Sequence, residues 1–230
     1  MPAYFIPSTP MQVVDFDYEA FFNSFKNRFE HLYFYPEWKN YWLKIFHETE
    51  NEVLDYVRRF PNSNPVLQRL KHGVAPDAYE MYVFEHVTEV GSFYLHFDVE
   101  KMKNFQRNAS LTKETLSIDE LYVDPTTPLN KEQEKDTRMP FFIRMYGTPQ
   151  PYICVDGNKR IKARIANGQE KFEGYIFEDK DVVDMFFGSP DQYYYIFLRE
   201  CEFMVKTQIL EESTQKDIFQ TTQMYLQGKG

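Results

Sequence analysis

The residues at positions 151–168 have the types and the spacing that phosphate chemistry requires. An apolar run at 152–155 leads into Asp156 and Gly157, and a helical pattern begins at Asn158. Glycine permits a sharp turn and a close approach of a ligand to the backbone, and the free N–H groups at the start of a helix favour an anion. Four basic residues follow, with no acidic residue among positions 157–164: Lys159, Arg160, Lys162 and Arg164. This pattern predicts a phosphate site at a strand-to-helix turn.

Each residue of the turn has an expected role. Gly157 and the backbone amides of Asn158 and Lys159 bind the phosphate, and Arg160 neutralises its charge. Asp156 orients Arg160, caps the helix, or holds a Mg²⁺ ion that bridges phosphate oxygens. A simpler interpretation stays open, in which Asp156 is only a helix cap and the basic side chains face solvent.

The elements that position this turn can be read from the apolar spacing. Strands are expected at 141–145, 152–155 and 175–177, with a helix at 158–166. A hairpin broken at Gly91 precedes them, and the basic stretch 99–115 is expected to be a short helix or a loop. A short strand or turn at 116–123 and a charged loop at 126–137 are expected to follow. Helices are expected from Asp17, from Pro36 to Phe60, up to Gly73, at 180–187, at 193–210 and at 218–226. The fold class predicted is α+β, with a small mixed sheet.

This organisation gives three expected regions that pack as one compact unit. They are an N-terminal helical region at 1–75, an α/β core at 76–178 and C-terminal helices at 179–230. The high aromatic content, with 22 Phe and 17 Tyr, is expected to fill the core, since the rings recur at helical spacing.

Composition excludes several classes of function. The net charge of −9 argues against sequence-independent binding to nucleic acid or to an anionic membrane, because both need a positive field. Only a local basic groove through Lys101, Lys103, Arg107 and the 159–164 segment would restore nucleic-acid binding. No apolar run reaches the length of a membrane span, and the two cysteines form no disulfide framework, so a cytoplasmic protein is expected. The five histidines have no metal-binding spacing, and no metal site is expected among them.

The string from Gly157 to Gly168 resembles the signature of the ParB/sulfiredoxin-like superfamily. That signature has a glycine, two variable residues and an arginine at a strand-to-helix turn, and here Asn158-Lys159-Arg160 follow Gly157. A second glycine, Gly168, stands eleven residues after the first, as in the chromosome-partitioning members. Upstream, the segment 116–125 is similar to the family's opening strand and acidic turn. The resemblance covers about residues 115–178, or about a quarter of the chain.

The resemblance implies a core of the ParB/sulfiredoxin-like type whose turn binds nucleotide phosphates. Members hydrolyse CTP, transfer the γ-phosphate of ATP or ADP, or are regarded as nucleases. Sulfiredoxin chemistry is disfavoured because Asn158 stands where the catalytic cysteine would be, and no helix-turn-helix domain for DNA partitioning is expected after this unit. The serine-kinase branch needs a carboxylate base, for which Glu120 or Asp119 is the candidate by position.

The leading hypothesis is therefore a nucleotide-binding protein that acts on a nucleoside triphosphate with Mg²⁺, as a hydrolase or phosphotransferase. Asp156, Arg160 and Glu120 are its candidate catalytic residues. Two alternatives stay open: a non-enzymatic interaction protein of phage or mobile-element type that keeps the core as a scaffold, and a nuclease. The sequence leaves undecided whether the chain is an enzyme.

Overall fold

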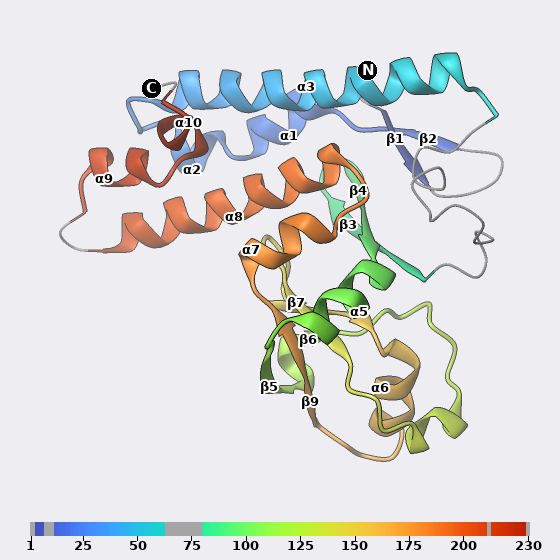
Figure 1. Ribbon diagram of the computed structural model, residues 1–230. Coiled ribbons are helices and arrows are strands. Elements are labelled where there is room, and N and C mark those ends of the chain that lie inside the picture. The colour runs from blue at the N-terminus through green and yellow to red at the C-terminus, as the bar shows by residue number, and fades with distance from the viewer. Residues whose placement is uncertain (1–2, 7–11, 63–79, 211–212, 229–230) are drawn as a thin grey trace. The chain divides into compact units, whose positions relative to one another are not determined.

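The computed structural model describes residues 3–6, 12–62, 80–210 and 213–228 (Figure 1). The protein is α+β, as the sequence predicts, with helices toward both ends of the chain and a small mixed sheet between them in sequence. The helix expected to end at Gly73 lies outside the described residues.

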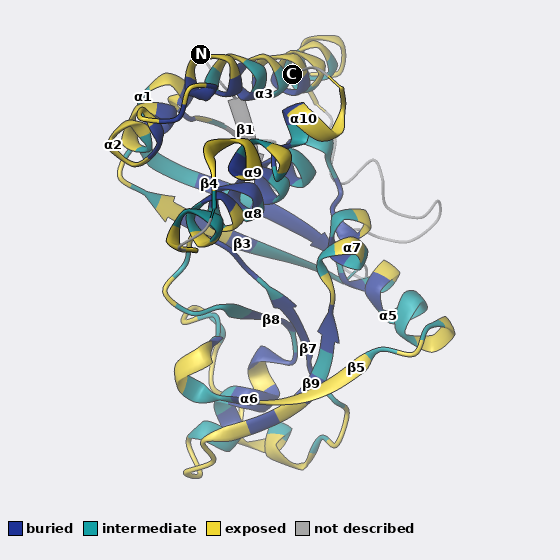
Figure 2. Ribbon diagram, turned by 90° about the vertical axis from the view of Figure 1, so that its left-hand side faces the viewer, coloured by how far each residue is buried: buried dark blue, intermediate teal, exposed yellow. Residues whose placement is uncertain are grey.

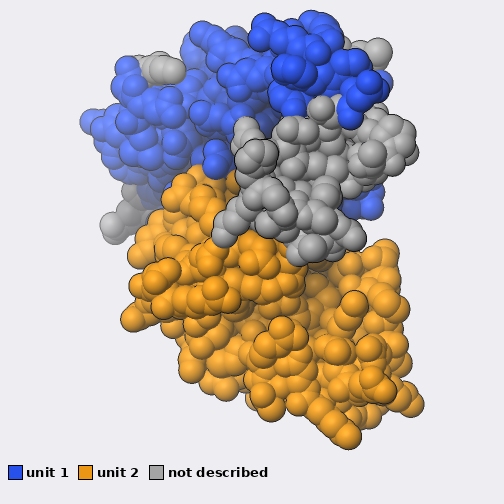
Figure 3. Space-filling view, turned by 45° about the vertical axis from the view of Figure 1, so that its right-hand side comes forward, with its two compact units in different colours: residues 1–78, 83–96, 187–230 blue, residues 79–82, 97–186 orange. Residues whose placement is uncertain are grey.

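The chain divides into two compact units (Figure 3). Unit 1 comprises Met1–Ala78, Val83–His96 and Phe187–Gly230, and unit 2 comprises Tyr79–Tyr82 and Phe97–Phe186. The expected N-terminal region and most of the expected C-terminal region thus fall in unit 1. Residues 179–186 belong to unit 2 with the sheet.

Unit 1 is mainly helical and is built from segments far apart in the chain. Its elements are β1 (Ala3–Ile6), β2 (Gln12–Asp15), α1 (Tyr18–Ser24), α2 (Lys26–Phe29), α3 (Tyr35–Arg59), α8 (Ser189–Ile209), α9 (Gln215–Gln220) and α10 (Gln223–Leu226). Strands β1 and β2 form an antiparallel pair. The hairpin of β3 (Met81–Thr88) and β4 (Gly91–Asp98) contributes most of its length to unit 1 and its ends to unit 2.

Local sequence signals explain where the helices of unit 1 begin. Asp17 caps α1 by accepting a hydrogen bond from the Ala20 N–H at 3.0 Å, as its position predicts. Pro36 lies in the first turn of α3, where a missing N–H costs nothing. Helix α8 begins at Ser189, four residues earlier than expected, because Pro190 starts the helix rather than ending the preceding one.

The core of unit 1 is built from aromatic rings. Phe197 of α8 lies within 5.0 to 5.9 Å, centroid to centroid, of rings from α1 and α3 that include Phe22, Trp42 and Phe46. All of these side chains are fully buried. Figure 2 shows buried residues along the ribbons of α3 and α8. The prediction that the aromatic residues fill the core is confirmed for this unit.

Unit 2 contains the sheet and several short helical segments. Its elements are α5 (Val99–Asn108), β5 (Thr112–Ser117), the 3₁₀ helix η2 (Ile118–Glu120), β6 (Leu121–Tyr122), η3 (Lys131–Lys135), β7 (Phe141–Arg144), β8 (Tyr152–Asp156), α6 (Asn158–Ile165), β9 (Lys171–Phe177), α7 (Asp179–Val182) and η4 (Val183–Met185). Strand β5 begins earlier than the sequence predicts. Its first four residues are polar and exposed (Figure 2), so they show no apolar alternation from which a strand could be predicted.

The five strands of unit 2 form a mixed sheet in the order β5-β9-β7-β8-β6. Helix α6 covers one face, where Ile161 packs with buried residues of the strands such as Phe142 and Phe172. On the other face, Phe105 of α5 contacts Phe177 of β9 at a centroid distance of 6.1 Å. Because β7 lies between β9 and β8, the segment that enters β7 is brought beside the turn that leaves β8.

None of the helices among the described residues combines the length and the apolar character that a membrane span needs.

Candidate functional site

The turn after β8 requires a glycine because of its close neighbours. Gly157 has a φ of +108° and stands at the N-cap of α6, which no side chain caps. A Cβ on Gly157 would lie 2.8 Å from Cβ of Pro140 and 3.0 Å from an Nη atom of Arg160. The close approach that requires glycine is therefore made by the protein's own Pro140 and Arg160, in the space where the sequence pattern predicts a ligand.

Arg160 is buried and is oriented by Asp156. Its Nη2 donates to Oδ2 of Asp156 at 3.1 Å, and its Nη1 lies 3.7 Å from Oδ2 of Asp136. The Arg160 side chain is only 5% exposed. Of the three roles expected for Asp156, the structure shows the orientation of Arg160, and it does not show a helix cap.

The other polar side chains of α6 bind the loop that precedes β7. Asn158 accepts from the backbone N–H of Asp124 at 2.9 Å and donates to the Cys154 carbonyl at 2.8 Å. Lys162 donates to the carbonyl oxygens of Pro125 and Thr127, at 2.7 and 2.5 Å.

Arg164 completes this anchoring by donating to the carbonyl of Asp136 at 2.7 Å. Lys159 alone among the basic residues of α6 is exposed. The interpretation of the basic residues as solvent-facing is thus wrong for Arg160, Lys162 and Arg164, since each is bonded within the protein.

Glu120 is not brought to this group. Its carboxylate accepts from the backbone N–H and from the hydroxyl of Ser117, both at 2.9 Å, and these bonds lower its pKa. Strand β6, which begins just after it, pairs in parallel with β8 so that Leu121 lies opposite Tyr152. Glu120 therefore lies near the first residue of β8, whereas Asp156 is the last residue of that strand.

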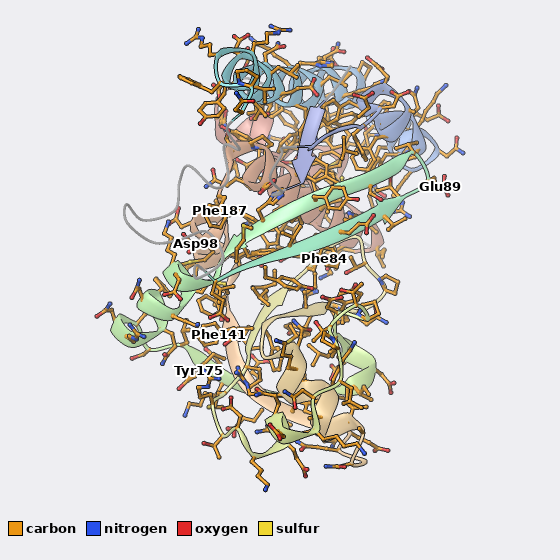
Figure 4. All side chains as sticks on the ribbon, turned by 90° about the vertical axis from the view of Figure 1, so that its right-hand side faces the viewer. Phe84, Glu89, Asp98, Phe141, Tyr175 and Phe187 are labelled. Carbon is orange, nitrogen blue, oxygen red and sulfur yellow. The ribbon has the colours of Figure 1, made fainter. Side chains whose placement is uncertain are left out.

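A cavity of 360 Å³ lies in unit 2 on the face of the sheet opposite α6. Its lining combines three cationic side chains, aromatic and apolar groups, and one carboxylate: Lys103, Gln106, Arg107, Arg138, Met139, Phe141, Asp156 and Tyr175. Phe141 and Tyr175 lie side by side on the parallel strands β7 and β9, with ring centroids 6.1 Å apart (Figure 4). The cavity thus has an aromatic floor and a basic rim.

The three cations at the rim differ in how far their charge is balanced. Lys103 forms an ion pair with Glu80 and lies 3.7 Å from a carboxylate oxygen of Glu100. Arg138 is paired with Asp136 at 2.6 Å. Arg107 has a hydrogen bond of 3.3 Å to the amide of Asn104, and no carboxylate of the described residues lies within ion-pair distance of it. Within the described part of the chain, Arg107 is therefore the cation of the cavity that has no ion-pair partner.

A fourth cation lies next to the aromatic floor. The Lys113 ammonium, from β5, stands 5.5 Å from the ring centroid of Tyr175, which is within the range of a cation–π contact. It adds positive charge beside the ring that forms part of the cavity floor.

The sequence pattern predicts only part of this site. It predicts Lys103 and Arg107 as members of a basic groove, but it predicts a charged loop at 126–137 and assigns no role to Asp136 or Arg138. The signal that could have drawn attention to the pair is the spacing Asp136-x-Arg138 directly before a strand, because the side chains of residues i and i+2 in an extended segment point to the same side.

The arrangement is suited to binding an anion. Arginine and lysine donors at a partly enclosed cavity attract phosphate or carboxylate groups, and the aromatic floor offers an apolar face beside them. In the described part of the chain, no three His, Cys, Asp or Glu side chains are grouped so that they could hold a metal ion.

Neither a family model, nor a curated protein, nor a solved structure matches this chain.

Proposed function

We propose that the cavity between α5 and the sheet of unit 2 binds the phosphate groups of a nucleotide. The observation that carries this proposal is the convergence of Lys103, Arg107 and Arg138, from two separate segments, on a cavity floored by Phe141 and Tyr175. Cationic donors bind the phosphates and the ring of Tyr175 packs against the base. The resemblance to the ParB/sulfiredoxin-like superfamily supports the same class of ligand.

The proposal changes the roles expected for the turn at Gly157. The cations that contact phosphate are those that line the cavity. Arg160 supports the site indirectly, through its ion pairs with Asp156 and Asp136. Asp156 lines the cavity, and within the described part of the chain only its Oδ2 is bonded, to Arg160, so we assign its Oδ1 to a Mg²⁺ ion that arrives with the nucleotide. One carboxylate together with substrate phosphates is a common ligand set for Mg²⁺.

A cytoplasmic location belongs to the same proposal. Cytoplasm supplies nucleotides and keeps thiols reduced, and the two cysteines, Cys154 and Cys201, are free and buried. Hydrolysis of the nucleotide and transfer of its phosphoryl group are activities of the protein to be assayed once the preferred base is known.

The test is the melting temperature of the protein with ATP, ADP, CTP and GTP, each with and without Mg²⁺. A ligand at about 100 times its Kd stabilises the folded state by about 2.7 kcal/mol, which is a readable shift. Arg107→Ala removes the cation that has no ion-pair partner among the described residues and should weaken binding about 10- to 100-fold, the loss of one charge-assisted hydrogen bond of about 1.5–3 kcal/mol.

Lys131→Ala is the matched control, because Lys131 is an exposed cation of the same unit that does not line the cavity. It should leave the nucleotide shift unchanged. Arg160→Ala is a poorer test, since it would leave Asp156 and Asp136 without their buried partner and destabilise the fold.

The alternatives are separated by the same experiment. If no nucleotide shifts the melting temperature, the proposal fails and the scaffold interpretation is favoured. Salt-sensitive retention of DNA that is lost in Arg107→Ala would instead favour the nuclease, since the basic groove then serves a polyanion.

A further inference from the structure

Asp136 holds one edge of the Arg138 side chain. Its carboxylate accepts from the backbone N–H of Arg138 at 3.0 Å and from Nε at 3.1 Å through both oxygens, and Oδ2 accepts from Nη2 at 2.6 Å. This is a side-on pair that uses the Nε and Nη2 edge of the guanidinium. The two residues are separated by only one position, so the pair fixes the extended segment just before β7.

The opposite edge of the guanidinium is left for a ligand. A guanidinium has five N–H donors, and the pair with Asp136 uses the Nε donor and one on Nη2. No described residue accepts from Nη1 of Arg138, whose side chain is 70% exposed and lines the cavity. The remaining Nη1 and Nη2 donors form the fork that binds two oxygens of a phosphate.

Asp136 is itself fixed by α6. Arg164 donates to its backbone carbonyl at 2.7 Å, and Arg160 Nη1 lies 3.7 Å from its Oδ2. The chain of contacts therefore runs from the buried Arg160 through Asp136 to the exposed Arg138. Without such support, a long arginine side chain on a loop would lose more conformational entropy when it orders around a ligand.

We propose that Asp136 is a positioning residue, which presents the free edge of Arg138 to a phosphate group in the cavity. This inference rests on the proposed function. It assigns a binding role to the pair Asp136–Arg138, for which the sequence pattern predicts no function.

Positioning and simple electrostatics predict opposite changes in the affinity for phosphate when Asp136 loses its charge. Asp136→Asn removes a negative charge beside the cavity, so Coulombic attraction alone would make an anion bind more tightly. Positioning predicts weaker binding, because the amide cannot accept from both Nε and Nη2 of Arg138. The free edge of the guanidinium is then no longer held toward the cavity.

The experiment is an NMR titration of the whole chain with inorganic phosphate, in which the Nε–H signal of Arg138 is followed as well. In the unaltered protein we expect saturable binding and a slowly exchanging Nε–H. In Asp136→Asn we expect a Kd about tenfold higher and a rapidly exchanging Nε–H, the loss of one charge-assisted hydrogen bond. Glu134→Gln, an equal change of charge at an exposed position of η3, should leave the Kd unchanged or lower it.

A double-mutant cycle separates positioning from a loss of fold. Arg138→Lys keeps the charge and removes the fork, so phosphate binding should weaken, and Asp136→Asn should weaken it no further in that background. The proposal is overturned if Asp136→Asn binds phosphate as tightly as the unaltered protein, or more tightly. If the unaltered protein does not bind phosphate although the Nε–H of Arg138 is protected, the proposed function itself fails.

Discussion

Gly157 shows at the scale of one residue how a turn can be specified by sterics and charge together. Its positive φ is a conformation that side chains rarely adopt, and the space that a Cβ would need is taken by Pro140 and by the guanidinium of Arg160. That guanidinium is in turn held by Asp156. The glycine is therefore required by packing within the turn, whether or not a ligand binds near it.

Gly157→Ala should consequently be more destabilising than an alanine at another glycine of positive φ. Gly168 is the matched control, because it has a φ of +83° and a Cβ at that position would meet no atom of the described residues within 4 Å. We expect about 1–2 kcal/mol of lost stability for Gly168→Ala from backbone strain, and at least about 1 kcal/mol more for Gly157→Ala. Urea unfolding measures both, and equal losses would contradict the steric argument.

At the scale of elements, α6 acts as the support of the loop at 124–138. The buried face of the helix packs on the sheet through Ile161, and its polar side chains reach the loop. Little of α6 is free to bind an external phosphate. Lys162 and Arg164 bind carbonyl oxygens, and Arg160 is buried between two carboxylates. The helix contributes to the proposed site indirectly, by fixing Asp136.

Removing one of these anchors should loosen the loop without unfolding the helix. Lys162→Met keeps the aliphatic stem and loses the two bonds to Pro125 and Thr127. Because a charge-assisted hydrogen bond contributes about 1.5 kcal/mol or more, amide hydrogen exchange at 124–130 should become about tenfold faster.

Lys159→Met is the control for this prediction, since Lys159 is on the same helix and is exposed. It should leave exchange in the loop unchanged. Unaltered exchange in Lys162→Met would mean that the two carbonyl contacts do not hold the loop.

For the molecule as a whole, a buried carboxyl group in unit 1 is expected to make the stability depend on pH. Glu200 of α8 accepts from the indole N–H groups of Trp38 and Trp42 through Oε1, the latter at 2.9 Å, and from the Gln223 N–H through Oε2 at 2.6 Å. It thereby joins α3, α8 and α10. Burial raises the pKa of Glu200 to about 7, although these three hydrogen bonds act in the opposite direction.

This raised pKa predicts that the protein is more stable at pH 5 than at pH 8. A group whose pKa is higher in the folded state than in the unfolded state stabilises the fold fully below the unfolded value of about 4.3, and this contribution is lost as the pH rises through about 7. The loss for Glu200 is on the order of 3 kcal/mol. Burial also raises the pKa of Glu50 to about 7, which adds to the effect in the same direction.

Chemical denaturation between pH 5 and pH 8 measures this dependence. In Glu200→Gln the difference between the two pH values should shrink, and the variant should be less stable at pH 5, because its amide nitrogen cannot accept from the Gln223 N–H. Glu48→Gln, at an exposed position of α3, should keep the full dependence. A flat pH profile in the unaltered protein would show that Glu200 is not protonated in the fold.

Sequence patterns predict the elements whose causes are local. The cap at Asp17, the proline at the start of α3, the aromatic helical stripes and the strand–glycine–helix turn at 152–165 depend on neighbours within a few residues, and sequence patterns predict them. The α+β class follows from these elements. The first residues of strand β5 escape prediction because an exposed edge strand has no apolar alternation to reveal it.

The partners of the charged side chains, by contrast, depend on how distant segments pack in the fold. The order β9-β7-β8 places the segment before β7 beside the turn after β8, so Arg160 meets Asp136 and Arg164 meets its carbonyl across more than twenty positions of sequence. The same sheet brings Phe141 next to Tyr175, opposite the basic residues of α5. A basic residue near a glycine turn has the same local pattern whether it binds a ligand, a carboxylate or a carbonyl, and the choice among these depends on which distant segment packs against it.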